Sequence, residues 1–171
     1  TASYNTAVGY QALEDLTTAD GTTAVGYQCL TKNTSGTVNA AFGYLTLGDN
    51  TTGSENAAFG TQSLQDNTDG NDNAACGFRA LRLNTTGSQN SAVGAFALDA
   101  NTTGDNNTAM GRNSLTNNTT ASNNTTVGYS ALSGCTTGTS NTTMGYSAGG
   151  SITTGGNNLC LGNGSGESTS P

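Results

Sequence analysis

Asn5-Thr6-Ala7-Val8-Gly9-Tyr10-Gln11-Ala12-Leu13 is the most informative segment for the fold, because close variants of it recur along the whole chain. Its glycine begins a series of ten anchor glycines that ends at Gly162 and keeps a constant spacing of 17 residues. A short, uninterrupted period is typical of solenoids, in which each unit is supported by its neighbours. Positions within a unit are counted from the anchor glycine, which is position 0.

The composition is polar but the register is strict. The 171 residues include 25 glycines and no histidine or tryptophan, and only 9% are charged. Such polarity is typical of disorder, yet disordered tracts do not need one fixed phase. Helices are disfavoured by the glycine and β-branched residues in every unit. We therefore predict one all-β domain over residues 1–171, a parallel β-solenoid (β-roll) of ten 17-residue coils. Each coil is expected to hold two short strands, near positions −4 to +1 and +2 to +5.

Two apolar columns predict the core. Position −1 is apolar in all ten units, and position +4 is leucine in eight. Two large apolar residues per coil fill only a narrow bore, so we expect coils stacked about 4.8 Å apart with both columns pointing inward. The predicted core residues are Val8, Val25, Phe42, Phe59, Val93, Leu13, Leu30, Leu47, Leu64, Leu81 and Leu98.

Position +7 predicts a polar ladder inside the bore. Where it is not asparagine it is Leu16, Cys135 or Ile152, and these apolar substitutes indicate an inward position. A buried asparagine must be hydrogen-bonded, and amides stacked at one coil spacing can bond to each other. The predicted ladder consists of Asn33, Asn50, Asn67, Asn84, Asn101 and Asn118. Position −4, asparagine in nine units, is either a second ladder or a left-handed turn residue.

Few groups are suited to catalysis or metal binding. The acidic residues lack the spacing of a calcium loop. The four cysteines occupy small or apolar columns and lie too far apart along the stack to pair, so we expect buried free thiols. We predict no enzyme activity, no catalytic residue, no cofactor and no metal site.

Charge limits the partners. The net charge is −7, and the four basic residues form no stripe. Nucleic acid and anionic membranes are therefore not expected partners. The chain also lacks an apolar stretch long enough for membrane insertion.

Two further columns support an alternative function. Threonine fills position +8 in all nine copies and most of position +9, and regular threonine arrays are typical of ice-binding solenoids. Adjacent strand residues point to opposite faces, however, which argues against such an array. Aromatic residues at position +1 predict either a contact surface for a glycan or partner chain, or stacking from coil to coil. The tyrosines of this column are Tyr10, Tyr27, Tyr44, Tyr129 and Tyr146. The alternative is thus an ice- or glycan-binding β-solenoid.

The last units depart from the pattern. Gly149 and Gly166 stand where the other units have leucine. We expect residues from about 149 to 171 to form a cap or the junction to a further segment.

The anchor motif resembles a known family. Asn90-Ser91-Ala92-Val93-Gly94-Ala95-Phe96-Ala97 is similar to the head repeats of trimeric autotransporter adhesins. The fuller pattern, Ala-Val-Gly-Tyr-x-Ala-Leu followed by Asn-Thr-Thr-Gly, also looks like repeats of viral and phage tail-fibre proteins. The resemblance implies a left-handed β-roll, wound as a homotrimer, displayed outside the cell and used for attachment. The family's units are commonly shorter than those of this chain.

We therefore expect a structural and adhesive segment of an extracellular, cell-surface or virion fibre. It would form a stiff stalk or head that presents a surface for attachment or fibre assembly. The expected partners are other copies of the chain, as a homotrimer or an end-to-end filament, and a surface glycan or receptor. The small residues at positions −2, 0 and +3 favour the trimer, because they would let chains approach closely.

Overall fold

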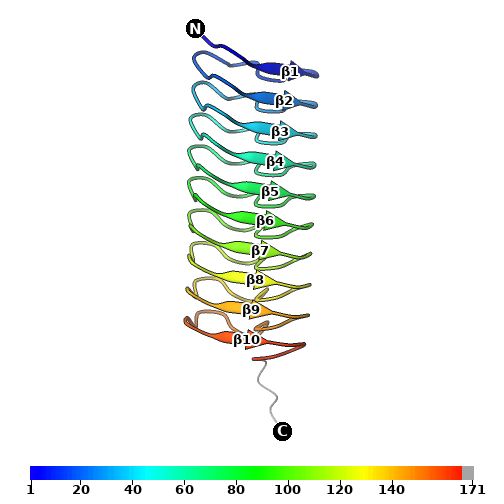
Figure 1. Ribbon diagram of the computed structural model, residues 1–171, viewed down its shortest axis with the longest axis vertical. Helices are drawn as coiled ribbons and strands as arrows, with labels where there is room; N and C mark the ends of the chain where they lie inside the picture. The colour runs from blue at the N-terminus through cyan, green and yellow to red at the C-terminus, as the bar shows by residue number, and fades with distance from the viewer. Residues whose placement is uncertain (167–171) are drawn as a thin grey trace.

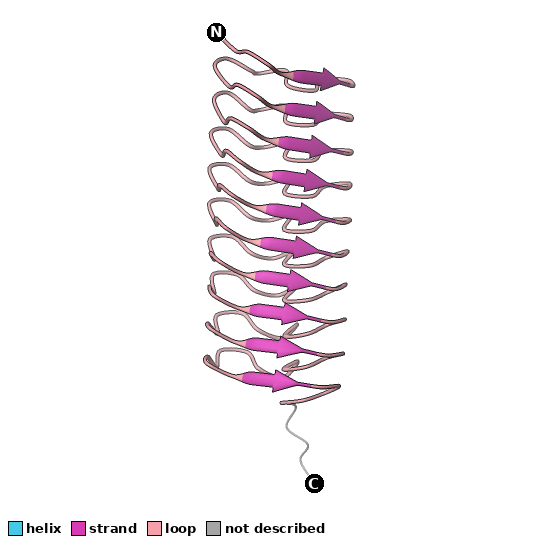
Figure 2. Cartoon of the chain, in the orientation of Figure 1, coloured by secondary structure: helices cyan, strands magenta, loops and turns pink. Residues whose placement is uncertain are grey.

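The computed structural model, which describes residues 1–166, is a β-solenoid of about nine turns (Figure 1). Its ten strands form one parallel sheet in the order β1 to β10, and residues 1–166 contain no helix (Figure 2). The predicted fold class is confirmed. The strands are β1 Thr6–Val8, β2 Thr23–Val25, β3 Ala40–Phe42, β4 Ala57–Phe59, β5 Ala74–Cys76, β6 Ser91–Val93, β7 Thr108–Met110, β8 Thr125–Val127, β9 Thr142–Met144 and β10 Leu159–Leu161.

The register of the sheet equals the period of the sequence. Each strand residue pairs with the residue 17 positions later, as in Ala41 with Ala58 and Phe42 with Phe59. Side chains of one repeat position therefore form straight columns along the stack. The described part of the predicted cap, 149–166, continues this stack through β10, which pairs with β9, and residues 167–171 of that prediction lie outside the described residues.

Each coil contains one strand, so the predicted second strand near positions +2 to +5 is wrong. In the fourth coil Gln62 and Leu64 have left-handed backbone angles, with φ of 58° and 50°. Left-handed residues at positions +2 and +4 interrupt an extended strand. The backbone still bonds from coil to coil there, because Gln62 N–H donates to Tyr44 O at 2.8 Å and Leu64 N–H donates to Ala80 O at 3.0 Å.

The prediction that position −1 lies in the core is wrong. In each three-residue strand the middle residue, usually alanine, points inward, and its two neighbours therefore point outward. Ala58 is fully buried, whereas Phe59 beside it is 45% exposed. Apolar character was taken as a sign of burial, although the small residue at position −2 marks the inward side. The residues corrected in this way are Val8, Phe42, Phe59 and Val93, which are exposed, and Val25, which is half-buried.

The leucine column at position +4 is confirmed as core. Leu13 is 7% exposed, and the other seven leucines of the column are completely buried. They pack against the alanines of position −2 and the small residues of position +3, such as Ala80 and Ala97. These small residues lie inside one chain, so they do not support the close contact between chains that a trimer would require.

The anchor glycine is required by both backbone angle and space. Gly60 has φ of +127°, a region that residues with a side chain rarely adopt. A Cβ at Gly60 would lie 2.7 Å from the carbonyl oxygen of Gly77 in the next coil. The constant glycine therefore sets how closely successive coils stack.

Candidate functional site

The predicted asparagine ladder at position +7 is confirmed. Asn84 Nδ2 donates to Asn67 Oδ1 at 2.8 Å, and equivalent bonds of 2.7–2.8 Å join all six residues from Asn33 to Asn118. All six side chains are fully buried. The ladder stops at Asn118, whose buried Oδ1 has no partner because the next coil has Cys135 at this position.

Position −4 forms a second buried ladder, which resolves the alternative left open by the sequence. Asn90 donates both its backbone N–H and its Nδ2 to Asn73 Oδ1, at 3.0 and 3.2 Å. The left-handed residue is the one before, at position −5, such as Gln89. The two ladders meet at one carbonyl, since Gly87 O accepts Nδ2 of Asn73 at 2.9 Å and Nδ2 of Asn84 at 2.8 Å.

Two more series of coil-to-coil bonds were missed by sequence reasoning. At position +8 the threonine hydroxyl donates to the backbone carbonyl of the threonine at the same position in the next coil. For example, Thr85 Oγ1 donates to Thr102 O at 2.9 Å. At position +11 a side-chain oxygen accepts the backbone N–H of the preceding coil, as Asp105 Oδ1 does from Ser88 at 2.8 Å. The signal was present, because every residue of this column from Asp20 to Thr139 carries a side-chain oxygen.

This use of the threonines weakens the ice-binding alternative. The position +8 side chains are mostly half-buried, and their hydroxyl protons are donated within the solenoid. Position +9 is exposed in all its copies, but it includes Ser35 and Asp69. The outward threonines of this turn therefore form one mixed column and no two-dimensional array.

The most distinctive surface is the outer side of the ten-stranded sheet, which we call the sheet face. It consists of the outward residues at positions −3 and −1 of strands β1 to β10, and none of them is charged. Position −1 supplies apolar side chains from end to end, for example Met110 at 45% and Met144 at 53% exposure. Phe42 and Phe59 stack on this face with ring centroids 5.0 Å apart. Contiguous apolar surfaces of a few hundred Å² on a monomer commonly mark interaction sites.

The acidic residues avoid the sheet face. All ten acidic side chains of residues 1–166 occur at positions −5, +5, +6, +9 and +11, which lie on the turns and other walls of the coil. They are Glu14, Asp15, Asp20, Asp49, Glu55, Asp66, Asp69, Asp72, Asp99 and Asp105. The net negative charge thus surrounds an uncharged strip, and contact with another acidic surface is least opposed at that strip.

The tyrosine column stacks on itself. Tyr10, Tyr27 and Tyr44 have successive ring centroids 5.2 Å apart and interplanar angles of 13–15°, and Tyr129 stacks on Tyr146 in the same way. All five are exposed, so the predicted contact surface is accessible. Both ring faces of Tyr27 are covered by its neighbours, however, and each of the other four rings has one face covered by a stacked tyrosine. The stacking thus leaves few ring faces open to a sugar, which argues against glycan binding by ring stacking along the column.

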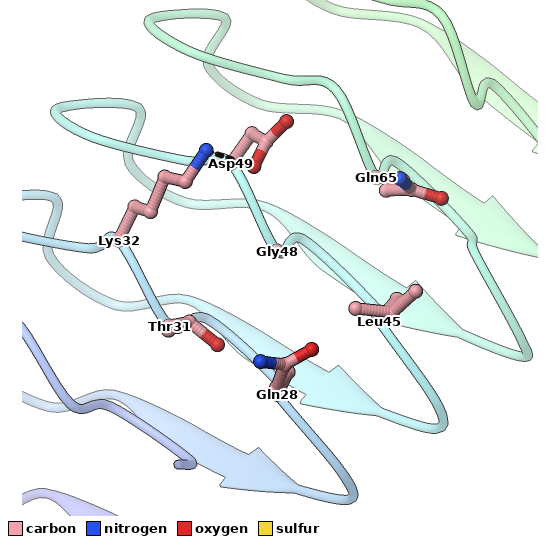
Figure 3. Close-up of a pocket in the computed structure, with 7 residues that line it drawn as sticks. All are labelled: Gln28, Thr31, Lys32, Leu45, Gly48, Asp49 and Gln65. Atoms are coloured by element: carbon pink, nitrogen blue, oxygen red, sulfur yellow. Dashed lines mark ion pairs between the residues drawn. The ribbon is translucent and has the colours of Figure 1, made fainter.

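A shallow pocket of about 240 Å³ lies beside Gly48 (Figure 3). It exists because Gly48 has no side chain at position +5, while the same position in the flanking coils holds Thr31 and Gln65. Lys32 Nζ and Asp49 Oδ1 form an ion pair of 2.7 Å at its rim, and this bond raises the pKa of Lys32. The pocket could accept a small polar molecule, but its two charged groups are already paired with each other.

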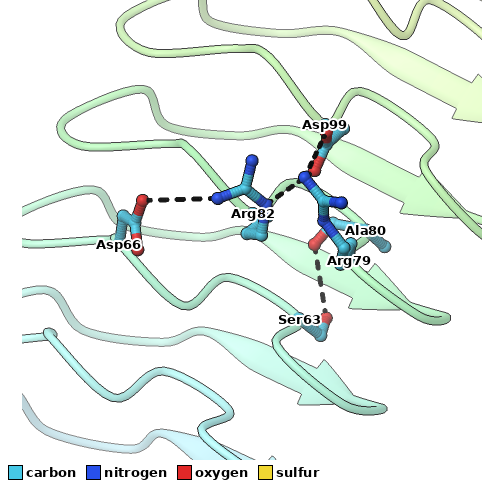
Figure 4. A network of polar contacts seen from close by, with 6 residues as sticks. All are labelled: Ser63, Asp66, Arg79, Ala80, Arg82 and Asp99. Atoms are coloured by element: carbon cyan, nitrogen blue, oxygen red, sulfur yellow. Dashed lines mark hydrogen bonds and ion pairs between the residues drawn. The ribbon is translucent and has the colours of Figure 1, made fainter.

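A second charged cluster joins three coils (Figure 4). Arg82 lies between two carboxylates, with Nε 3.1 Å from Asp99 Oδ1 and a terminal nitrogen 4.0 Å from Asp66 Oδ2. Arg79 contacts Asp99 at 3.3 Å and lies over the Phe96 ring at 5.1 Å. Burial raises the pKa of Asp66 despite the nearby Arg82. The cluster links neighbouring coils, and partly exposed pairs of this kind contribute little stability.

The cysteines only partly follow the prediction. All four are free, and Cys29, Cys135 and Cys160 are buried as expected. Cys76 is exposed, because it occupies the outward position −1. Burial raises the pKa of the Cys29 thiol to about 12.

Within residues 1–166, no group of three or more His, Cys, Asp or Glu side chains is placed to hold a metal ion. The same residues contain no helix of the length and apolarity needed to span a membrane. No protein-family model, curated protein sequence or solved structure matches the chain.

Proposed function

We propose that this chain is a structural and adhesive segment of an extracellular, cell-surface or virion fibre, which attaches or assembles through its sheet face. The observation that carries the proposal is the uncharged sheet face, apolar along its position −1 column over the full stack of strands, while all acidic side chains of residues 1–166 lie elsewhere. The resemblance of the anchor motif to adhesin-head and tail-fibre repeats points in the same direction.

The interior supports a mechanical role. Two asparagine ladders, the position +8 hydroxyls and the position +11 oxygens repeat the same bonds in successive coils. The parallel sheet adds backbone bonds at the same spacing. Bending the rod would stretch the coil-to-coil hydrogen bonds on its convex side. The arrangement therefore favours a stiff element that holds a surface at a distance.

Immunogold electron microscopy tests the location. Antibodies raised against the purified chain are applied to the cells or virus particles that produce the protein, both intact and broken open. We expect gold on fibres at the outer surface of intact samples, and no gold when the antibody is first absorbed with the chain. Gold found only after the samples are broken open would contradict the proposal.

The ice- and glycan-binding alternative requires its own measurement. Thermal hysteresis and binding to a glycan array are measured with the purified chain, with a Tyr27→Ala variant as comparison because Tyr27 is the centre of its stack. We expect neither hysteresis nor saturable glycan binding. Glycan binding that is lost in the variant would favour the alternative and would transfer the binding role from the sheet face to the tyrosine column.

A further inference from the structure

We propose that the partner of the sheet face is a second copy of this chain, packed face to face and parallel about a two-fold axis that runs along the stack. This inference rests on the proposed function and specifies the partner of the same surface. Three features of the sheet face carry it: its charge, its area and the sizes of its side chains.

The charge pattern favours a like partner. Two copies of a chain with net charge −7 repel each other wherever acidic residues meet. Positions −3 and −1 carry no charge in any of the ten strands. Face-to-face contact of two sheets therefore brings together a long surface of each copy that carries no charge.

The area is sufficient for a specific but modest interface. Ten strands about 4.8 Å apart and three residues wide give a strip of about 43 by 10 Å, or about 430 Å² per copy in projection. Two such strips bury about 900 Å² before the roughness of the side chains is added, close to the lower bound of about 1,000 Å² for specific interfaces. The pair is thus expected to dissociate on dilution.

The side-chain sizes select the orientation. The two phenylalanines at position −1, Phe42 and Phe59, share their strands with Ala40 and Ala57, the smallest residues found at position −3. Where position −1 is valine or methionine, position −3 is threonine or serine. Two strands depart from this inverse relation: β5 has the small residues Ala74 and Cys76, and β10 has leucine at both positions.

A two-fold axis along the stack converts this relation into a fit between copies. That axis keeps each coil opposite the same coil of the partner and exchanges the two columns, so position −1 of one copy faces position −3 of the other. Each phenylalanine then meets an alanine across sheets about 10 Å apart. An axis along the strands would instead set position −1 against position −1 and reverse the order of the coils.

Light scattering after size exclusion tests the pairing over a concentration series from about 1 μM to 1 mM, the range in which weak pairs form. We expect the mass to rise towards twice the chain mass of 17.0 kDa. Phe59→Glu is expected to keep the monomer mass throughout, while Thr103→Glu, which adds the same charge at an exposed turn position, pairs as the wild type does. Circular dichroism melting identifies any variant that has lost the fold.

A size exchange tests the fit. Ala57→Phe alone is expected to weaken pairing at least tenfold, because two phenylalanines would then meet across the interface. The double variant Ala57→Phe/Phe59→Ala restores the large-to-small match and should recover pairing. Pairing that the single change leaves unaltered, or that the exchange fails to recover, would overturn the orientation.

Cross-linking tests the direction of the coils. In a Cys76→Ser background, Thr23→Cys places one partly exposed thiol on β2. Twin thiols lie about 12 Å apart if the copies are parallel and about 35 Å apart if they are antiparallel, from the strand and sheet spacings. A short bis-maleimide should therefore give covalent dimers, and its failure to do so would refute the parallel arrangement.

The remaining outcomes separate this inference from the proposed function. A wild type that stays monomeric at 1 mM overturns self-pairing, while surface gold labelling would still support a fibre segment with another partner. A trimer that Phe59→Glu dissociates overturns the two-fold axis and retains the sheet face as the assembly surface.

Discussion

Replacing Asn84 by alanine tests the ladder at position +7. Asn84 makes three bonds of 2.8 Å: it donates to Asn67 Oδ1 and to Gly87 O, and it accepts from Asn101 Nδ2. After the substitution Gly87 O keeps its bond to Asn73. Two buried groups are left without a partner, the Asn67 oxygen and one Asn101 N–H. Each unsatisfied buried group costs about 1–3 kcal/mol, so we expect a loss of about 4 kcal/mol.

The end of the same ladder provides a graded comparison. Asn118 Oδ1 has no partner in the wild type, and Ala121 O, which Asn118 also contacts, keeps its bond to Asn107. Asn118→Ala leaves the oxygen of Asn101 without a partner, but it also removes the unpaired oxygen of Asn118, so we expect a loss well below that of Asn84→Ala and at most about 2 kcal/mol. The matched control is Thr86→Ala, since Thr86 is exposed and close to Asn84 in sequence, and its change should stay within about 0.5 kcal/mol.

Urea unfolding followed by circular dichroism at fixed protein concentration measures the three variants. Asn84→Ala is expected to destabilise the fold clearly more than either Asn118→Ala or Thr86→Ala. These differences matter more than the absolute values, because they depend only on the net number of buried hydrogen-bonding groups that each substitution leaves without a partner. Equal losses for the two asparagine variants, or a loss for Asn84→Ala as small as that of the control, would refute the ladder argument.

The other predictions concern the coil spacing, the core and the thiols. Gly60→Ala should lower the free energy of unfolding by about 3 kcal/mol or more, because its Cβ would lie 2.7 Å from the carbonyl oxygen of the next coil at a positive φ. Gly48→Ala should change it by no more than about 0.5 kcal/mol. The melting temperatures of the two variants check both values. Leu64→Ala should cost about 3 kcal/mol in urea unfolding, since its side chain is fully buried. In the native protein Cys76 should be the thiol that reacts quickly with maleimide, and Cys29 should react only on unfolding, as mass spectrometry of the labelled peptides will show. Because burial raises the Cys29 pKa from 9.0 to about 12, its neutral form stabilises the fold below pH 9, and this contribution should fall as the pH rises from 9 towards 12.

The candidate site could be read from the sequence only in part. The acidic residues keep to a few repeat positions, and this segregation was visible in the columns. The significance of this segregation was not visible, because the sequence places position −1, which forms half of the sheet face, in the interior. The same error hid Cys76, whose exposure follows from its place at position −1. The stacking of the tyrosines was one of two alternatives open from the sequence, and the ring distances decide for it.

The stacked architecture follows from the sequence alone. An unbroken period of 17 residues leaves each unit only its neighbours to pack against, and the apolar substitutes at position +7 show that its asparagines face inward. The direction of position −1 depended on the tertiary structure. A three-residue strand turns only its middle residue inward, and left-handed residues such as Gln62 and Leu64 end the extended run and bring the leucine column across the bore. Alanine then suffices opposite the leucines, so the larger side chains of the strand, Phe59 among them, remain on the outside.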